Sequence, residues 1–199
     1  MIPKTRWILY AIIFSYLFQA CRNSGIREYD RIVKKELASG KRVDSLFFGI
    51  YLGMTSKSFY TYCWGMNKKQ VFTDGTNNLA VLYKLNHQEL KYPASMNFYP
   101  KFFEDKIYKM GVTFQYVSWA PWNRGMYSDT LILDILKLYG KWYPDGNPFI
   151  RIYEKNKGTI YIKVDGNRRI TIGKYDDMQV KADYTDLLIE PKLNEKNVK

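Results

Sequence analysis

The stretch that decides the fold class is Thr159-Ile160-Tyr161-Ile162-Lys163-Val164-Asp165-Gly166-Asn167-Arg168-Arg169-Ile170-Thr171-Ile172. Isoleucine and valine alternate with threonine, tyrosine and lysine over residues 159–164, a period of two that is typical of a half-buried strand. Asp165-Gly166-Asn167 is a turn sequence. We therefore expect an antiparallel hairpin in which Ile170 and Ile172 continue the apolar face, while the other face meets water.

An amphipathic helix is predicted before these strands, from about Ser128 to Trp142. Its apolar side chains recur three, four and seven positions apart, at Leu131, Ile135, Leu138 and Trp142. A helix with one apolar stripe and a sheet with one apolar face bury each other's surface. The sequence therefore predicts an α+β fold with helices packed on an antiparallel sheet.

The same order of elements is predicted earlier in the chain. A helix from Thr55 to about Lys68, capped by Thr55 or Ser56, presents four residues at helical spacing: Phe59, Tyr62, Cys63 and Met66. Strands follow each helix, at 79–85, 95–99, 103–108 and 111–117 in the first half and at 149–153, 159–164, 168–172 and 178–184 in the second. This order predicts two repeats of a helix and three to four strands, at 46–122 and 123–186.

Two short segments flank these repeats. Residues 21–45 are predicted to form a tether and a short helix from Ile26 to Leu37, and a strand is expected at Leu46 to Tyr51. Residues 187–199 are predicted to be a polar C-terminal tail.

The first 21 residues have the composition of an export signal. Lys4 and Arg6 precede an uncharged apolar run of 12 residues, Trp7 to Phe18, and Ala20-Cys21 follows. The run is shorter than the roughly 20 residues that a transmembrane helix needs. Residues 1–20 are therefore predicted to be a cleaved signal peptide. The cysteine is then either a lipid attachment site or incidental to a plain secretory signal.

Ala20-Cys21 after an apolar run resembles the bacterial lipoprotein signal, although Phe18 and Gln19 replace the small residues usual there. The resemblance implies that Cys21 is acylated, so that its acyl chains hold the protein in a membrane. Arg22 in place of aspartate after the cysteine implies, by resemblance to lipoprotein sorting rules, an outer-membrane location. We expect the protein to face the periplasm.

Charge narrows the class of partner. The chain carries 31 Lys and Arg against 19 Asp and Glu, a net charge of +12 that falls to +10 when Lys4 and Arg6 leave with the signal. Such a balance suits nucleic acid, anionic lipid or an acidic protein. Export and the absence of a compact Lys/Arg block argue against nucleic acid. The ordinary explanation is a solvated basic surface.

Motifs for catalysis or metal binding are absent from the sequence. His87 is the only histidine, and Cys63 is the only cysteine besides Cys21. The apolar neighbours of Cys63 predict a buried, inert thiol. Glu104-Asp105 lie on a predicted strand, where adjacent side chains point to opposite faces, and Asp176-Asp177 lie between strands, where turn residues are expected. We therefore favour turn chemistry over acid–base or calcium sites. We therefore expect no enzyme, no cofactor and no metal.

Aromatic residues make up 17% of the chain, with 18 Tyr and 5 Trp, and they are the best candidates for binding. Tyr and Trp are enriched at protein interfaces. Trp119 and Trp122 join the two predicted repeats, where they either fill the joint or form an exposed binding loop. The hairpin is expected to place three tyrosines with Lys163 on its outer face: Tyr153, Tyr161 and Tyr175.

Two resemblances to known proteins concern larger parts of the chain. The entry Gly53-Met54-Thr55 into the first helix, with the element order over about 46–186, resembles the β-lactamase-inhibitor-protein-like architecture, which includes the small lipoprotein of the barrel-assembly machinery. The segments 63–68 and 119–123 look similar to uncharacterised lipoproteins of gut-type Gram-negative bacteria. Neither resemblance implies a catalytic residue.

We expect a lipid-anchored, non-catalytic protein-binding or assembly module with an unidentified protein partner. A glycan-binding lipoprotein is one alternative, and two coplanar exposed aromatic rings beside carboxylates or amides would favour it. A hydrolase is a second, and a deep cleft that holds two carboxylates would favour it.

Overall fold

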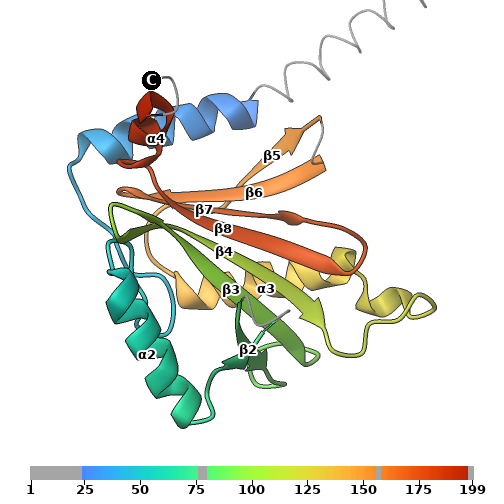
Figure 1. Cartoon of the computed structure of the whole chain (residues 1–199). Helices are drawn as coiled ribbons and strands as arrows, with labels where there is room; N and C mark the ends of the chain where they lie inside the picture. The colour runs from blue at the N-terminus through green and yellow to red at the C-terminus, as the bar shows by residue number, and fades with distance from the viewer. Residues whose placement is uncertain (1–23, 76–79, 156–157, 197–199) are drawn as a thin grey trace, which may run out of the picture.

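The computed structural model describes residues 24–75, 80–155 and 158–196, and it combines helices with one eight-stranded antiparallel sheet (Figure 1). This confirms the predicted α+β class and the antiparallel strands. The signal peptide and Cys21 lie outside the described residues. No helix in the described part of the chain is long and apolar enough to cross a membrane.

The described chain begins with a helix at 24–38, as predicted for 26–37. The elements of the first half are α2 (Ser56–Lys68), β1 (Thr73–Asp74), β2 (Val81–Leu85), β3 (Ala94–Phe103) and β4 (Lys106–Tyr116). Those of the second half are η2 (Arg124–Met126), α3 (Ser128–Trp142), β5 (Ile150–Glu154), β6 (Gly158–Asp165), β7 (Arg168–Lys174), β8 (Gln179–Asp186) and α4 (Glu190–Lys196).

The sheet joins the two halves of the chain into one surface. Its strand order is β1-β2-β3-β4-β8-β7-β6-β5, so that β4 and β8 pair at the centre. Each half therefore consists of one helix followed by a four-stranded meander. The order of elements agrees with the predicted one, and it does not by itself establish an internal repeat.

One face of the sheet, here called the inner face, carries the main core. The α3 residues Leu131, Ile135 and Leu138 are buried against it as predicted, and Trp142 is partly buried. Phe59 of α2 is fully buried, while Tyr62, Cys63 and Met66 pack on the same core. The predicted cap of α2 is also present, because the Thr55 side chain accepts a hydrogen bond from the Ser58 N–H.

The register of the β6–β7 hairpin contradicts the predicted single apolar face. Asp165 pairs with Arg168, so the turn has only two residues, and Gly166 supplies its positive φ of 55°. With this register Ile170 and Ile172 share the inner face with Tyr161 and Lys163. The other isoleucines of the hairpin therefore lie on the opposite, outer face, because side chains alternate along a strand.

Both faces of this hairpin are consequently covered. The helix at 24–38 packs through Ile32 on the outer face, over a second core that contains Ile150, Ile152, Ile160, Ile162, Val164 and Leu187. The prediction of one water-exposed face is wrong, because this helix supplies a second apolar cover.

Lys163 is also misplaced by the sequence-based prediction, since it is 3% exposed. Its ammonium donates to the carbonyl oxygens of Asp145 and Asn147 and lies 3.5 Å from the Asp165 carboxylate. These partners compensate the buried charge. Lys163 therefore holds the 145–147 segment against β6, and it is not part of a recognition surface.

Three further predictions of local structure need correction. Residues 46–51 form no strand but an irregular loop, closed by a bridge between Ser45 and Tyr51 and bent at Phe48, whose φ is positive. The strands expected at 103–108 and 111–117 are one strand, β4, because the chain turns at Glu104-Asp105. The segment expected as a polar tail contains buried Leu187 and α4.

Candidate functional site

The outer face of the sheet is open wherever the helix at 24–38 does not cover it. The register places small and polar side chains of the central strands there: Ser95, Asn97, Gly111, Thr113, Gln115, Thr171, Gly173, Gln179 and Thr185. Most of these residues are partly exposed. The inner positions of the same strands are apolar and buried, so this face is a polar surface on a rigid support.

Lysines concentrate on this open face. Lys101 and Lys109 are direct cross-strand partners, an arrangement of like charges that destabilises a sheet. Lys109 and Lys181 both lie 3.6 Å from the carboxylate of Asp183. With Lys84 on β2, the strands β2, β3, β4 and β8 present four lysines and one carboxylate on this face. The open face therefore has a local excess of positive charge.

Asp183 has an unusual environment at the centre of this face. Its Oδ2 meets both lysines, whereas its Oδ1 is buried without a hydrogen-bond partner among the described residues. A Cβ added at Gly111, opposite it, would lie 3.6 Å from that oxygen. The oxygen therefore lies over a position without a side chain. A buried acceptor without a hydrogen bond lowers the stability of the fold unless a ligand or a water molecule donates to it.

An aromatic margin borders the open face on the side of α2. The hydroxyls of Tyr60 and Tyr99 are 2.7 Å apart, and the Tyr60 ring lies 6.2 Å from that of Phe102. Both tyrosines are about half exposed. Trp64, one turn further along α2, is exposed beneath the ammonium of Lys68, 3.5 Å from the ring centre.

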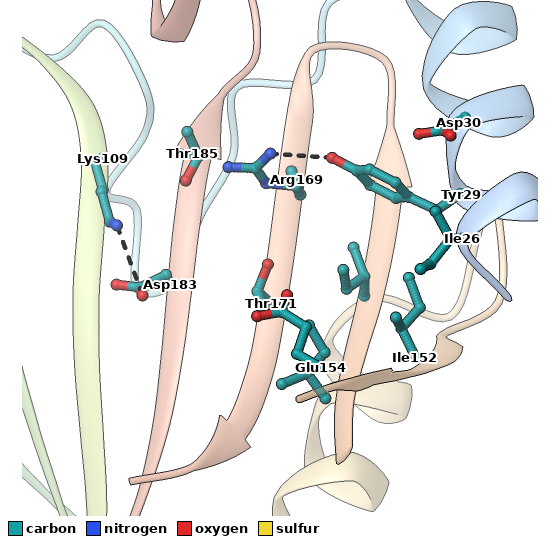
Figure 2. A pocket seen from close by; sticks show the side chains of 12 residues that line it. Ile26, Tyr29, Asp30, Lys109, Ile152, Glu154, Arg169, Thr171, Asp183 and Thr185 are labelled. Atoms are coloured by element: carbon teal, nitrogen blue, oxygen red, sulfur yellow. Dashed lines mark hydrogen bonds and ion pairs between the residues drawn. The ribbon is translucent and has the colours of Figure 1, made fainter. Parts of the chain in front are cut away.

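A cleft of about 470 Å³ opens at the other margin, where the helix at 24–38 meets the sheet. Figure 2 shows Ile26, Tyr29 and Asp30 of the helix on one side and Lys109 and Asp183 on the other, with Thr171 between them. Its apolar residues are Ile26, Ile152, Ile160 and Ile162, and its polar residues are Tyr29, Asp30, Lys109, Glu154, Arg169, Thr171, Asp183 and Thr185. The cleft thus has an apolar wall and a polar wall.

A contact between two backbones fixes the helix above this cleft. A Cβ added at Gly25 would lie 2.8 Å from the carbonyl oxygen of Arg151 on the edge strand β5, which only glycine avoids. At the other end, the Arg169 guanidinium donates to the Tyr29 hydroxyl (3.0 Å) and pairs with Glu190 (2.5 Å). These partners raise the pKa of Arg169, which stays charged and closes one end of the cleft.

A second cavity of about 410 Å³ continues the cleft along β7. The two cavities share Ile160, Thr171 and Asp183. The second is further lined by Gly173, Lys174, Tyr175 and Lys181. Together they form one groove, here called the β7 groove, from Arg169 to Tyr175. Six residues of strand span roughly 20 Å.

The predicted binding residues do not form one site. Trp119 is partly buried, with its ring 6.1 Å from Tyr127 and its indole N–H buried without a partner among the described residues. Trp122, by contrast, is 85% exposed. The first indole is therefore partly buried and the second stands in an exposed segment, and a binding role for either residue remains a prediction.

The register puts Tyr153 and Tyr161 on one face of the sheet with Lys163, but this is the inner face and not the outer face that was predicted. The three predicted tyrosines do not line one cavity. Tyr161 faces α3, and together with the exposed Tyr175 it lines a third cavity, of about 570 Å³, that is bounded by α3 and the strand ends. Tyr153 is about half exposed and lies outside the lining of all three cavities. Tyr175 alone of the five predicted residues contributes to the β7 groove.

Carboxylates in these cavities bear on the hydrolase alternative. The cleft contains Asp30, Glu154 and Asp183, and so meets the criterion of two carboxylates in one cleft. The third cavity contains Asp129, whose carboxylate is paired with Lys174 at 2.7 Å, and the turn residues Asp176 and Asp177. Asp176 accepts the N–H groups of Met178 and Gln179, as expected for turn chemistry.

Metal ligands and reactive thiols find little support in the described part of the chain. No group of three or more His, Cys, Asp and Glu side chains there could hold a metal ion. His87 is exposed, and a nitrogen of its ring lies 3.2 Å from the Lys91 carbonyl oxygen. Burial raises the pKa of Cys63 to about 12, so its thiol is protonated at neutral pH.

No local pattern in the sequence predicts the β7 groove, since its walls come from the helix at 24–38 and five strands. The useful signal is the alternation Lys109-Gly111-Thr113 and Lys181-Asp183-Thr185, which marks a polar face opposite buried positions. No protein-family model, curated protein or solved structure matches this chain. The resemblances stated above therefore remain predictions.

Proposed function

We propose that this protein is an exported, non-catalytic binding module whose open sheet face binds a protein partner through an acidic surface. The observation that carries the proposal is the excess of lysine on a face that no described segment covers. Lys101 and Lys109 repel each other across two strands, and an acidic partner relieves that repulsion. Charge complementarity of this kind also accelerates association.

Tyrosines at the margin strengthen the case for a protein partner. Tyr60 and Tyr99 present half-exposed rings beside the lysines, and tyrosine is enriched at interface hot spots. A flat surface of short polar side chains on paired strands needs little reordering upon binding.

The hydrolase alternative has one observation in its favour, the three carboxylates of the cleft. Asp183, however, is held between two lysines. No histidine, cysteine or serine lines the cleft among the described residues. Tyr161 and Tyr175 beside Asp129 favour the glycan alternative in part. They do not supply the pair of exposed rings that this alternative requires, because Tyr161 is partly buried against the main core.

The proposal also includes the lipid anchor and the duplication. Ala20-Cys21 after an apolar run supports acylation at Cys21 and attachment to the outer membrane on its periplasmic side. The arrangement of one helix and four strands in each half, joined through β4 and β8, supports an origin from a repeated unit.

The proposal is tested in cells with a photo-crosslinking residue at Thr113, at the centre of the open face. The expected result is a crosslink to an acidic segment of one protein, identified by mass spectrometry of the joined peptides. Reversing the charges with Lys84→Glu and Lys101→Glu, two lysines of the open face that lie outside the β7 groove, should abolish the crosslink.

Lys34→Glu and Lys35→Glu, on the exposed side of the helix at 24–38, form the matched control because they change the net charge equally. The control should keep the crosslink. Equal loss in both double variants would show that total charge, and not the open face, attracts the partner, and the proposal would fail.

A further inference from the structure

We infer that the β7 groove receives an extended peptide segment of the partner, in which acidic residues flank an aliphatic or aromatic side chain. The inference rests on the proposed function and names the part of the partner that is recognised. It is carried by three properties of the groove: its length, its two unlike walls and the polar groups left open along it.

The length and volume of the groove suit an extended segment. The two cavities share three residues and measure about 470 and 410 Å³, each within the range of about 300–1,000 Å³ typical of ligand sites. A strand-like segment of about six residues covers the roughly 20 Å from Arg169 to Tyr175. A compact small molecule would fill only one of the cavities.

The apolar wall of the groove explains why we expect an aliphatic or aromatic side chain at the centre of the peptide segment. Ile26 remains 45% exposed although it stands beside Ile152 and Ile160 in the cleft. Gly173 allows Ile160 to pack closely against β7, because a Cβ there would lie only 3.1 Å from a methyl carbon of Ile160. An aliphatic or aromatic side chain buried here removes apolar surface from water at about 25 cal/mol per Å².

The polar wall accounts for the acidic flanks. Lys109 stands in the first cavity and Lys181 in the second, and both share the single carboxylate of Asp183. Each lysine is therefore only partly neutralised. The other two carboxylates of the cleft, Asp30 and Glu154, belong to the helix at 24–38 and to the edge strand β5, so the positive side of the groove is the one formed by β4 and β8. The two ammonium groups each lie 3.6 Å from one oxygen of Asp183, so they are at most about 7 Å apart. The acidic residues two positions before and two positions after the apolar one lie about 14 Å apart on one face of an extended segment, so each approaches the lysine pair from its own side.

The orphan oxygen of Asp183 lies between the two cavities, and it accounts for backbone recognition. A backbone N–H of the segment can donate to this acceptor, which lacks a partner among the described residues, once the side chains that bury it move aside. The Arg169, Tyr29 and Glu190 cluster closes the groove beyond this point, so the segment ends there or turns away.

The test measures fluorescence anisotropy of labelled hexapeptides with the full chain. Four probes carry Glu-Ser-X-Ser-Glu-Ser, with Leu, Ile, Val or Phe at X, and two controls carry Ser at X or Lys in place of Glu. At least one probe should bind, and both of its controls should bind at least about tenfold more weakly. The protein concentration is raised to 0.5 mM, which detects complexes with a Kd up to roughly 1 mM. If no probe binds at this concentration, the inference is overturned.

A pair of matched variants locates the site. Thr171→Phe places a ring where the two cavities meet and should weaken binding about tenfold or more. Thr113→Phe makes the same change on the same face outside both cavities and should keep the affinity. Thr171→Val, which preserves shape, checks that any loss is not a folding defect. Equal effects of the two phenylalanine variants would refute the groove as the site.

The outcome is separable from that of the proposed function. If the charge-reversed variants lose the cellular crosslink while no probe binds, the open face still recruits the partner and only the groove is wrong. If the probes bind and the crosslink does not depend on Lys84 and Lys101, the groove binds peptides and the proposed use of the open face is wrong.

Discussion

Glu36 connects the helix at 24–38, which borders the β7 groove, to the β6–β7 hairpin, which lies beneath it. Its replacement is a stringent test of the structure. One carboxylate oxygen accepts the Gly166 N–H and the other accepts the Asn147 side-chain amide, both at 2.8 Å. These two hydrogen bonds lower the pKa of Glu36 from its usual 4.5. Glu36→Gln keeps the shape, but its NH₂ group must face one of the two donors.

The expected cost follows from this geometry. Hydrogen bonds to a charged group contribute about 1.5–3 kcal/mol, and Gly166 is buried, so its N–H would lose its partner. Since Glu36 is partly exposed and water can replace one bond, we expect Glu36→Gln to lower the free energy of unfolding by about 2 kcal/mol. For a domain of this size the melting temperature should fall by roughly 4–8 °C.

Urea denaturation followed by circular dichroism measures the effect, with Glu28→Gln on the exposed side of the same helix as control. The folded-state pKa of Glu36 lies below its unfolded value, so the advantage of the natural residue is complete above pH 4.5 and disappears as the pH falls through the folded-state pKa. Two results would refute the reasoning: a difference below about 0.5 kcal/mol between the two variants, or a difference that does not shrink as the pH is lowered below 4.5.

Three further predictions address the remaining features. Cys21→Ser should move the protein from the membrane fraction to the soluble fraction, and unchanged membrane binding would disprove acylation at this residue. Trp119→Ala should lower stability by about 3 kcal/mol, whereas Trp122→Ala should change it by less than about 0.5 kcal/mol, as thermal unfolding would show; equal effects would contradict their different exposure. Cys63 should react with iodoacetamide at pH 8 only after unfolding, and fast labelling of the folded chain would contradict its raised pKa.

The sequence predicted well what depends on local periodicity. Helix α3 spans the residues expected from the stripe of Leu131 to Trp142, and the Thr55 cap begins α2. Each of these depends on neighbours within one or two turns. The antiparallel class followed in the same way, from alternation next to turn sequences.

Predictions failed where one residue of register decides the result. A turn of two residues instead of three between β6 and β7 places Ile170 on the same face as Lys163, whereas the predicted turn places them on opposite faces. Composition cannot reveal this difference, because both faces of the hairpin are covered and both tolerate apolar side chains. The same limit explains why the alternation, although right, places Tyr161 on the wrong face.

The groove was beyond prediction for a different reason. Its walls bring Ile26 and Tyr29 against strands more than 120 residues later in the chain, through contacts that no local pattern encodes. Gly25 is the one sequence feature with a specific role in this contact, since it admits the backbone of Arg151. A glycine at a helix start has many possible roles, and only the folded chain selects this one.

The anchor and the groove, if both are present, act together. At most about 11 Å of chain separates Cys21 from Ser24, and Ile26 and Tyr29 of the groove lie within the first two turns of the helix that follows. Acylation at Cys21 would thus hold the groove at the membrane surface, so its partner must present an acidic segment there. A 20-residue Gly/Ser insertion before Ser24, which adds roughly 25 Å of reach, should reduce the Thr113 crosslink in cells while leaving peptide affinity unchanged. A crosslink of undiminished yield would show that the partner does not require the groove to lie at the membrane.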